Sequence, residues 1–306
     1  MNWTGVMPAL TTAFDANLKI DHEFVARHAQ WQVDNGVTGL IALGSLGEAA
    51  TLSLDEKISV IKTLVKAVDG KVPVVAAISA LSTDEAVKIA QGAHANGASG
   101  LMILPPYVYL GDWREMKTHV AAVLKATPLT AMLYNNPVAY GTDFSPEHIQ
   151  ELAADYANLA AVKESSTDVR RVTAIHALIG DRLAVCVGVD DCIVEGIGAG
   201  AVGWVAGLVN ALPRESVELF RLASEGKRKE AFELYRWFLP LLRMDTVPKF
   251  IQLIKQVQQE LGVGSARVRG PRMEVRGNEL AEVQTAVRMA ITNRPAVALA
   301  STPFAR

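Results

Sequence analysis

Short apolar segments alternate with stretches of helical periodicity along most of this chain, and this alternation limits the fold more than any other feature. The eight apolar segments are 6–14, 39–44, 72–78, 100–104, 129–134, 159–162, 183–187 and 202–206. They are apolar without a break instead of alternating with polar residues, which is typical of parallel strands buried on both faces. The pattern therefore predicts repeated β/α units around a parallel sheet.

The segments between these strands begin like helices. Ser53 is followed three residues later by Glu56, and Ser82 by Glu85, which is the spacing of a capping box. In a capping box the two side chains satisfy free N–H groups of the first helical turn. Pro146 stands at the start of another helical stretch, where the missing N–H of proline has no consequence. We therefore expect helices between the strands.

Eight such units close most simply into a (β/α)8 TIM barrel, an α/β fold, and a doubly wound open sheet is the alternative. Beyond about residue 225 the strand pattern stops, and helical stretches remain at 229–242, 248–261 and 279–292. We therefore predict a barrel in residues 1–224 and a C-terminal three-helix extension in residues 225–306 that packs on the barrel.

Charge, cysteine content and hydropathy exclude several classes of protein. The formal net charge of −2 argues against nucleic-acid binding, which needs a basic surplus. Cys186 and Cys192 are too few for a disulfide framework, and we expect Cys186 to be a reduced core thiol. No leader pattern opens the chain and no apolar run approaches the roughly 20 residues that span a bilayer. We expect a soluble cytoplasmic protein with neither nucleic-acid nor membrane partners.

The carboxyl ends of the predicted strands carry the residues most relevant to chemistry, because these ends line the active site of a TIM barrel. They hold, in chain order, Thr11, Thr12, Gly44, Ser45, Leu46, Gly47, Tyr107, Tyr134, Lys163, Gly188 and Asp190. The glycine-rich turn after the second strand can present successive backbone N–H groups to an anion such as a carboxylate. Tyr134 and Ser45 provide hydroxyl groups that can pass protons.

Lys163 directly follows the sixth apolar segment. Desolvation at the end of a buried strand disfavours the ammonium form and leaves a nucleophilic amine. Such an amine can condense with a ketone or an imine to form a Schiff base, which stabilises an adjacent carbanion. The alternative is a lysine that extends from the strand end into solvent.

Five motifs occur in a characteristic order on this β/α repeat. They are Gly44-Ser-Leu-Gly-Glu48, Leu104-Pro-Pro-Tyr107, Tyr134-Asn-Asn-Pro137, Val162-Lys-Glu164 and Gly188-Val-Asp-Asp191. Together they resemble the dihydrodipicolinate synthase / N-acetylneuraminate lyase family, over roughly residues 4–290. The resemblance implies a Schiff-base lyase or aldolase that acts on a 2-keto acid.

The resemblance also implies a role for individual residues. Lys163 would form the Schiff base, Tyr134 would shuttle protons near the substrate carboxylate, and Ser45 would provide a hydroxyl of the relay. Tyr107 stands where the synthases have a tyrosine supplied across a dimer interface, so a homo-oligomer, most often a dimer of dimers, is expected. The predicted substrate-binding residues are Gly44, Leu46, Gly47, Thr11, Thr12, Tyr140, Gly188 and Asp190. No cofactor and no metal is expected.

Two positions depart from the pattern of the synthases. Leu46 replaces the second threonine of Gly-Thr-Thr-Gly-Glu, which removes a hydroxyl from the carboxylate site. Ala139, beside Tyr140, stands where the synthases have an arginine that binds the carboxylate of aspartate semialdehyde. An alanine cannot hold an anion, so both departures argue against the synthase reaction.

The motifs are most similar to the branch of 1-pyrroline-4-hydroxy-2-carboxylate deaminases. We therefore expect deamination and dehydration of that cyclic imine to 2,5-dioxopentanoate and ammonia. The alternatives are a 4-hydroxy-tetrahydrodipicolinate synthase and a 2-keto-3-deoxy sugar-acid dehydratase or aldolase. A non-catalytic ligand-binding barrel is an alternative of a different class.

Three further signals favour structural interpretations. The G-x-G-x-x-G match at residues 198–203 closes a helix instead of opening one, so it predicts tight helix–strand packing and not a dinucleotide site. The six histidines form no pair with the spacing of metal ligands. Glu48 is expected to brace the glycine turn in preference to acting as a general base.

Overall fold

The computed structural model describes residues 1–295, and within them eight strands form one parallel sheet in the order β1-β8-β7-β6-β5-β4-β3-β2. The strands are β1 Gly5–Pro8, β2 Leu40–Ala42, β3 Val74–Ile78, β4 Gly100–Ile103, β5 Thr130–Asn135, β6 Leu159–Glu164, β7 Ala184–Val187 and β8 Gly203–Ala206. A parallel bridge between Ala9 and Ile41 joins the two edges. The sheet therefore closes into the predicted (β/α)8 barrel.

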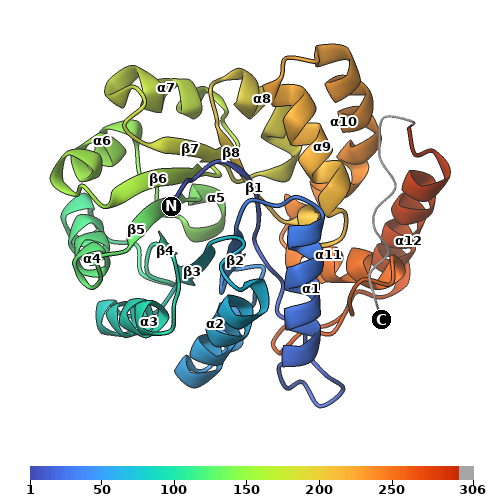
Figure 1. Ribbon diagram of the computed structural model, residues 1–306, viewed down its shortest axis with the longest axis horizontal. Coiled ribbons are helices and arrows are strands. Elements are labelled where there is room, and N and C mark those ends of the chain that lie inside the picture. Colours follow the sequence, from blue (N-terminus) through green and yellow to red (C-terminus); the bar gives the residue numbers. More distant parts are fainter. Residues whose placement is uncertain (296–306) are drawn as a thin grey trace.

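Helices surround the strands, as Figure 1 shows. Those that follow the strands are α1 His22–Asp34, α2 Leu54–Val68, α3 Thr83–Ala95, α4 Trp113–Lys125, α5 Pro137–Tyr140, α6 Pro146–Asp155, α7 Arg170–Ile179, α8 Ile193–Gly198 and α9 Pro213–Ser224. Short 3-10 turns are η1 Ala49–Thr51, η2 Asp190–Cys192, η3 Leu208–Asn210 and η4 Arg243–Asp245. None of the helices in residues 1–295 is both long and apolar enough to cross a bilayer.

Three more helices follow α9 and fit the expected C-terminal extension: α10 Arg228–Leu242, α11 Phe250–Glu260 and α12 Gly277–Thr292. Helix α10 packs against α9, and the indole N–H of Trp237 on α10 donates to the carbonyl of Ala290 on α12 at 2.9 Å. The division at residues 224 and 225 stays a prediction, and the last part of the predicted extension, 296–306, lies outside the described residues.

The predicted helix starts are correct, with one difference in their caps. Ser53 and Glu56 form the full capping box at the start of α2. At α3 only half of the box forms, because Ser82 accepts from the N–H of Glu85 while the Glu85 carboxylate faces Lys57 at 3.4 Å. Lys57 is buried, and a buried ammonium group needs a nearby carboxylate more than a helix start needs its second cap.

The ends of two predicted strands are wrong. The strand predicted over 6–14 ends at Pro8 in the structure, after which the chain turns away through Thr11 and Thr12. The strand predicted over 159–162 continues to Glu164, because both neighbouring strands extend the hydrogen-bonded ladder. Lys163 therefore lies within β6 and not after it.

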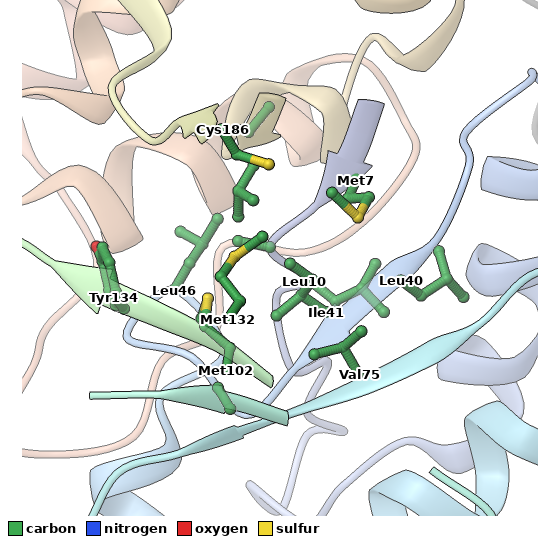
Figure 2. Close-up of a cluster of buried hydrophobic side chains, with 14 of the residues drawn as sticks. Met7, Leu10, Leu40, Ile41, Leu46, Val75, Met102, Met132, Tyr134 and Cys186 are labelled. Carbon is green, nitrogen blue, oxygen red and sulfur yellow. The ribbon is translucent and has the colours of Figure 1, made fainter. Parts of the chain in front are cut away.

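The barrel interior is filled by apolar and sulfur-containing side chains (Figure 2). Met7, Met102 and Met132 are almost fully buried, and flexible thioether side chains fill irregular interiors well. Cys186 is a free, buried thiol as predicted, and burial raises its pKa to about 12. The core therefore reaches from the centre of the barrel up to the ring of Tyr134.

Candidate active site

Lys163 is a buried lysine whose amine contacts an aromatic ring but forms no hydrogen bond or ion pair with the described residues. Its residue is 5% exposed, and it pairs with Tyr134 on β5 and with Cys186 on β7. The Nζ atom lies 4.1 Å from the centroid of the Tyr134 ring, over its face, a position that favours a cation. Within residues 1–295 the amine makes no hydrogen bond and no ion pair. It is therefore free to react with a ligand that enters the barrel.

Gly188 makes room for this lysine. A Cβ atom at Gly188 would lie 2.4 Å from Cε of Lys163 and 2.0 Å from Oγ of Ser165, closer than atoms can approach. The glycine after β7 therefore gives the lysine side chain the space that it occupies.

Three tyrosines form a row that ends at Lys163. The ring of Tyr140 lies edge-on to that of Tyr134 with centroids 5.8 Å apart, and 5.7 Å from the ring of Tyr107. The hydroxyls of Ser45 and Tyr140 are hydrogen-bonded to each other. Tyr107, Tyr134 and Ser45 are thus brought together as predicted residues, and Tyr140 connects them.

The row is positioned by the turn after β5. Asn136 donates to the hydroxyl of Tyr134 at 3.0 Å, and its side-chain oxygen caps α5 by accepting from the N–H of Ala139 at 2.9 Å. Gly141, with φ of 72°, ends this short helix directly after Tyr140. The Asn-Asn-Pro sequence thus bends the chain so that Tyr140 faces Tyr134.

The tyrosine hydroxyls are weak acids in this setting. Burial raises the pKa of Tyr107, although hydroxyls of Ser79 and Ser45 oppose the shift. Burial also raises the pKa of Tyr140, and the nearby Tyr134 and Tyr107 raise it further. Both groups therefore keep their protons near neutral pH and can donate or relay them.

Glu48 braces the glycine turn, as the sequence predicted. Its carboxylate is fully buried and lies 2.7 Å from Nζ of Lys255 on α11, and it accepts from the N–H of Arg269 at 2.9 Å. Lys255 also donates to the carbonyl of Thr12 at 2.9 Å. The turn Gly44–Glu48 is therefore fixed from behind by the C-terminal helices.

Thr11 and Thr12 lie behind the same turn. The Thr12 hydroxyl donates to the carbonyl of Gly47 at 2.7 Å, and the Thr11 hydroxyl donates to Gln258 at 3.0 Å. Leu46 is 3% exposed and belongs to the apolar core. The side chains of Thr11, Thr12 and Leu46 already contact protein. Contact of these three residues and of Gly44 with a substrate stays a prediction.

Asp190 is enclosed by hydrogen-bond donors at the end of β8. It is fully buried and accepts from the indole N–H of Trp204 at 3.1 Å and from the backbone N–H groups of Gly207 and Leu208 at 3.1 and 2.7 Å. Its carboxylate therefore holds η3 against β8. Whether it also contacts a substrate stays a prediction.

Two charged side chains near the barrel mouth were not predicted from the sequence. Arg272, in the loop between α11 and α12, lines a cavity of about 620 Å³ beside η1, and its positive charge opposes the rise that burial causes in the pKa of Tyr107. Asp245, in η4, lies against Gly207 at the end of β8. Both lie between the predicted C-terminal helices, in segments where nothing in the sequence indicates contact with the strand ends.

A larger cavity, of about 670 Å³, lies between α10 and α12 and includes Trp237 and Met289, but none of the predicted site residues lines it. In the part of the chain that the structure describes, no group of three His, Cys, Asp or Glu side chains is placed to hold a metal ion. The chemistry therefore centres on Lys163 and its neighbours.

The fold and the site define a (β/α)8-barrel protein with a buried lysine in the sixth strand, beside a row of hydroxyl groups. The model of the Dihydrodipicolinate synthetase family matches residues 2–290, and the chain belongs to this family of lyases. It is 33% identical over 268 residues to a 4-hydroxy-tetrahydrodipicolinate synthase of Bartonella bacilliformis, covering 87% of this chain and 91% of the relative.

Solved structures agree. The 4-hydroxy-tetrahydrodipicolinate synthase of Methylacidiphilum fumariolicum SolV superposes with a TM-score of 0.92 at 25% identity, covering 95% of this chain and 97% of that one. A putative dihydrodipicolinate synthetase from Pseudomonas aeruginosa superposes with a TM-score of 0.90 at 29% identity, covering 94% of this chain and all of that one.

Proposed function

We propose that this protein is a Schiff-base lyase that acts on a 2-keto acid or its cyclic imine, with Lys163 as the nucleophile. The observation that carries the proposal is the buried Lys163 amine, which lies over the Tyr134 ring and has no partner within residues 1–295. An amine that only stabilised the fold would be expected to have an acceptor, because buried polar groups are normally hydrogen-bonded.

The hydroxyl row supplies the protons for Schiff-base formation. The Lys163 amine attacks C2 of a keto acid, and the carbonyl oxygen takes up a proton as the C–O double bond opens. A second proton then allows this oxygen to leave as water. Tyr134 lies next to the amine and Tyr140 is linked to Ser45, so these hydroxyls form a path along which protons can move.

The substrate that we favour is 1-pyrroline-4-hydroxy-2-carboxylate. Ala139 is exposed on α5 and Leu46 is buried in the core, so neither provides a group that binds a second substrate carboxylate. A cyclic imine with a C4 hydroxyl needs only one carboxylate site. Elimination of that hydroxyl, followed by hydrolysis, would release 2,5-dioxopentanoate and ammonia.

The second candidate is 4-hydroxy-tetrahydrodipicolinate synthase. Curated relatives at 29–33% identity carry that name, which is the observation in its favour. It requires a binding site for the carboxylate of aspartate semialdehyde, which the exposed Ala139 does not offer. A 2-keto-3-deoxy sugar-acid dehydratase or aldolase would use the same Schiff base.

A homo-oligomer, most simply a dimer of dimers, is part of this proposal. Large apolar side chains are exposed in the loops beside the tyrosine row, with Val108 95%, Leu110 64% and Val138 72% exposed. Val108 also has a backbone φ of 71°, an uncommon conformation for a β-branched residue. A second copy of the chain would cover these side chains, and a measured native mass tests this.

Borohydride trapping read by intact mass tests the proposed function. The protein is incubated separately with pyruvate and with the pyrroline acid, reduced, and digested to locate the adduct, while ammonia release is measured in parallel. An adduct on Lys163 together with ammonia from the pyrroline acid supports the deaminase. An adduct with pyruvate but no ammonia moves the assignment to the synthase or an aldolase, and no adduct with either indicates a ligand-binding barrel.

A further inference from the structure

Asp245 places a carboxylate at the open end of the barrel. It is the last residue of η4, which connects α10 to α11, and it is half-buried. A Cβ atom at Gly207, directly after β8, would lie 2.2 Å from Oδ1 of Asp245. The carboxylate therefore occupies the space that a side chain at the end of β8 would otherwise take.

This carboxylate differs from its two acidic neighbours in having no partner. Asp190 accepts from three N–H groups, and Asp191 faces the guanidinium of Arg243 at 3.5 Å. Among residues 1–295, no group donates a hydrogen bond to Asp245 and none forms an ion pair with it. Its oxygens are therefore free to accept a proton or a hydrogen bond from a ligand.

Asp245 and Lys163 approach the barrel mouth from neighbouring strands. Lys163 lies on β6, β7 pairs with both β6 and β8, and Gly188 and Gly207 directly follow β7 and β8. Each glycine leaves room for one of the two side chains. The tyrosine row lies on the other side of Lys163, on β5 and the turn after it.

The charges around Asp245 favour its neutral form. Burial and the nearby carboxylates of Asp190 and Asp191 raise its pKa well above the usual range, while the positive charge of Lys163 acts in the opposite direction. A carboxyl group that no donor holds in its ionised form can take up a proton and return it, which suits a general acid–base catalyst.

We propose that Asp245 is the catalytic acid–base group that moves protons on the substrate carbon chain once Lys163 has formed its iminium. This inference rests on the proposed Schiff-base function and adds a residue to it. The tyrosine row transfers protons during formation of the Schiff base. Asp245 transfers protons at the substrate carbon next to the iminium.

The step balances as a proton transfer followed by an elimination. The ionised Asp245 carboxylate takes a proton from the carbon next to the iminium, and the C–H electron pair forms the enamine double bond and neutralises the nitrogen. The nitrogen lone pair then re-forms the iminium, the electrons of the enamine double bond form a double bond to the next carbon, and the hydroxyl on that carbon leaves with the C–O electron pair. Asp245 returns its proton to that oxygen, so water leaves and the carboxylate is regenerated.

The tyrosines are less suited to remove this proton. Because burial raises the pKa of both Tyr107 and Tyr140, their hydroxyls remain protonated near neutral pH and cannot act as bases. Asp190 is surrounded by N–H donors and lies fully within the protein. Asp245 is half-buried, and within residues 1–295 neither of its carboxylate oxygens accepts a hydrogen bond.

The test measures exchange of the methyl protons of pyruvate in D₂O, followed by NMR, together with borohydride trapping of the same samples. The full-length Asp245→Asn variant is expected to form the Lys163 adduct like the wild type, while exchange falls by at least about 100-fold, the scale of lost general acid–base catalysis. Asp181→Asn, at an exposed aspartate after α7, is the matched control and is expected to exchange at the wild-type rate.

The outcomes separate this inference from the proposed function. If the wild type traps pyruvate and Asp245→Asn exchanges at the wild-type rate, the inference is overturned and the lyase stands. If Asp245→Asn loses the adduct as well, Asp245 acts on the amine and the inference is also overturned. If the wild type forms no adduct, both the inference about Asp245 and the proposed Schiff-base function are overturned.

Melting curves show whether the variants fold. If Asp245→Asn is misfolded, Asp245→Glu is compared with Asp245→Ala. Recovered exchange in the glutamate variant alone supports a carboxyl base at this position. Equal exchange rates in the two variants contradict it.

Discussion

Two lysines are buried in this barrel, and only one of them is a candidate nucleophile. Lys163 and Lys255 are 5% and 1% exposed, and each lies over an aromatic ring, with Nζ 4.1 Å from the centroid of Tyr134 and 4.5 Å from that of Phe14. Lys255 binds Glu48 and the carbonyl of Thr12, whereas Lys163 has no acceptor within the described chain. Hydrogen bonding, and not burial, therefore distinguishes the structural lysine from the candidate nucleophile.

The strongest test of this comparison removes the free amine. Lys163→Ala is expected to lower kcat on the order of 10⁶-fold, the scale seen when a catalytic nucleophile is lost. The midpoint of thermal unfolding should hardly change, because the amine makes no hydrogen bond to the described residues. Steady-state kinetics and calorimetry check this, and a fully active variant would contradict the assignment.

Removing the hydrogen-bonded amine of Lys255 should lower stability, in contrast to the removal of the Lys163 amine. Lys255→Met leaves the buried Glu48 carboxylate without its opposite charge, so the free energy of unfolding is expected to fall by about 3–5 kcal/mol. Adding Glu48→Gln should recover much of this loss, because the uncompensated charge is removed too. Urea unfolding of both single variants and the double variant measures the coupling; an unchanged single variant would show that the pair contributes nothing.

His28 extends the comparison to a buried group whose pKa is lowered by burial. Burial lowers the pKa of His28 to about 4, although its Nε2–H donates to the carbonyl of Asn210 at 2.8 Å. The unfolded chain binds a proton near pH 6.5 and the folded protein does not, so stability falls as pH decreases. The expected loss is about 3 kcal/mol between pH 6.5 and 4.

Unfolding free energies of the wild type and of His28→Gln over this pH range test the prediction. The variant lacks the titrating group and should show the smaller decrease. Parallel pH curves for the two proteins would mean that His28 does not titrate as its burial indicates.

A methyl group at Gly188 sharpens the comparison by moving Lys163 without removing it. Gly188→Ala would place Cβ 2.4 Å from Cε of Lys163, so the amine must shift. We expect kcat to fall about 100-fold, which is typical when a reacting group is displaced by about 1 Å. Gly198→Ala on α8 is the matched control, since nothing lies within 4 Å of its added Cβ. Equal rates in the two variants would refute the spacing role of Gly188.

The sequence predicts the barrel well because each of its signals is local. Continuous apolar segments indicate buried parallel strands, and capping residues such as Ser53 indicate where helices begin. Lys163, Tyr134 and Ser45 were found because they lie at or just after the carboxyl ends of strands, which meet at one end of a barrel.

The contacts that the sequence does not reveal join distant parts of the chain. Glu48 and Lys255 are separated by 207 positions, and Lys255 looks like an ordinary residue of an amphipathic helix. Asp245 belongs to a turn between two helices, where an acidic residue normally faces solvent. The extra length of β6 depends on ladders from both neighbouring strands, which no single segment encodes.

Arg269 links the C-terminal loop to the first two β/α units. It donates to the carbonyls of Leu18 and Thr51, forms two hydrogen bonds with Glu56, and stacks on the ring of Phe14. During synthesis the first strands leave the ribosome long before this residue does. The first two β/α units of the nascent chain therefore lack their contacts with Arg269. The glycine turn Gly44–Glu48 gains its contacts with Lys255 and Arg269 only after α11 and the loop that follows it have been synthesised.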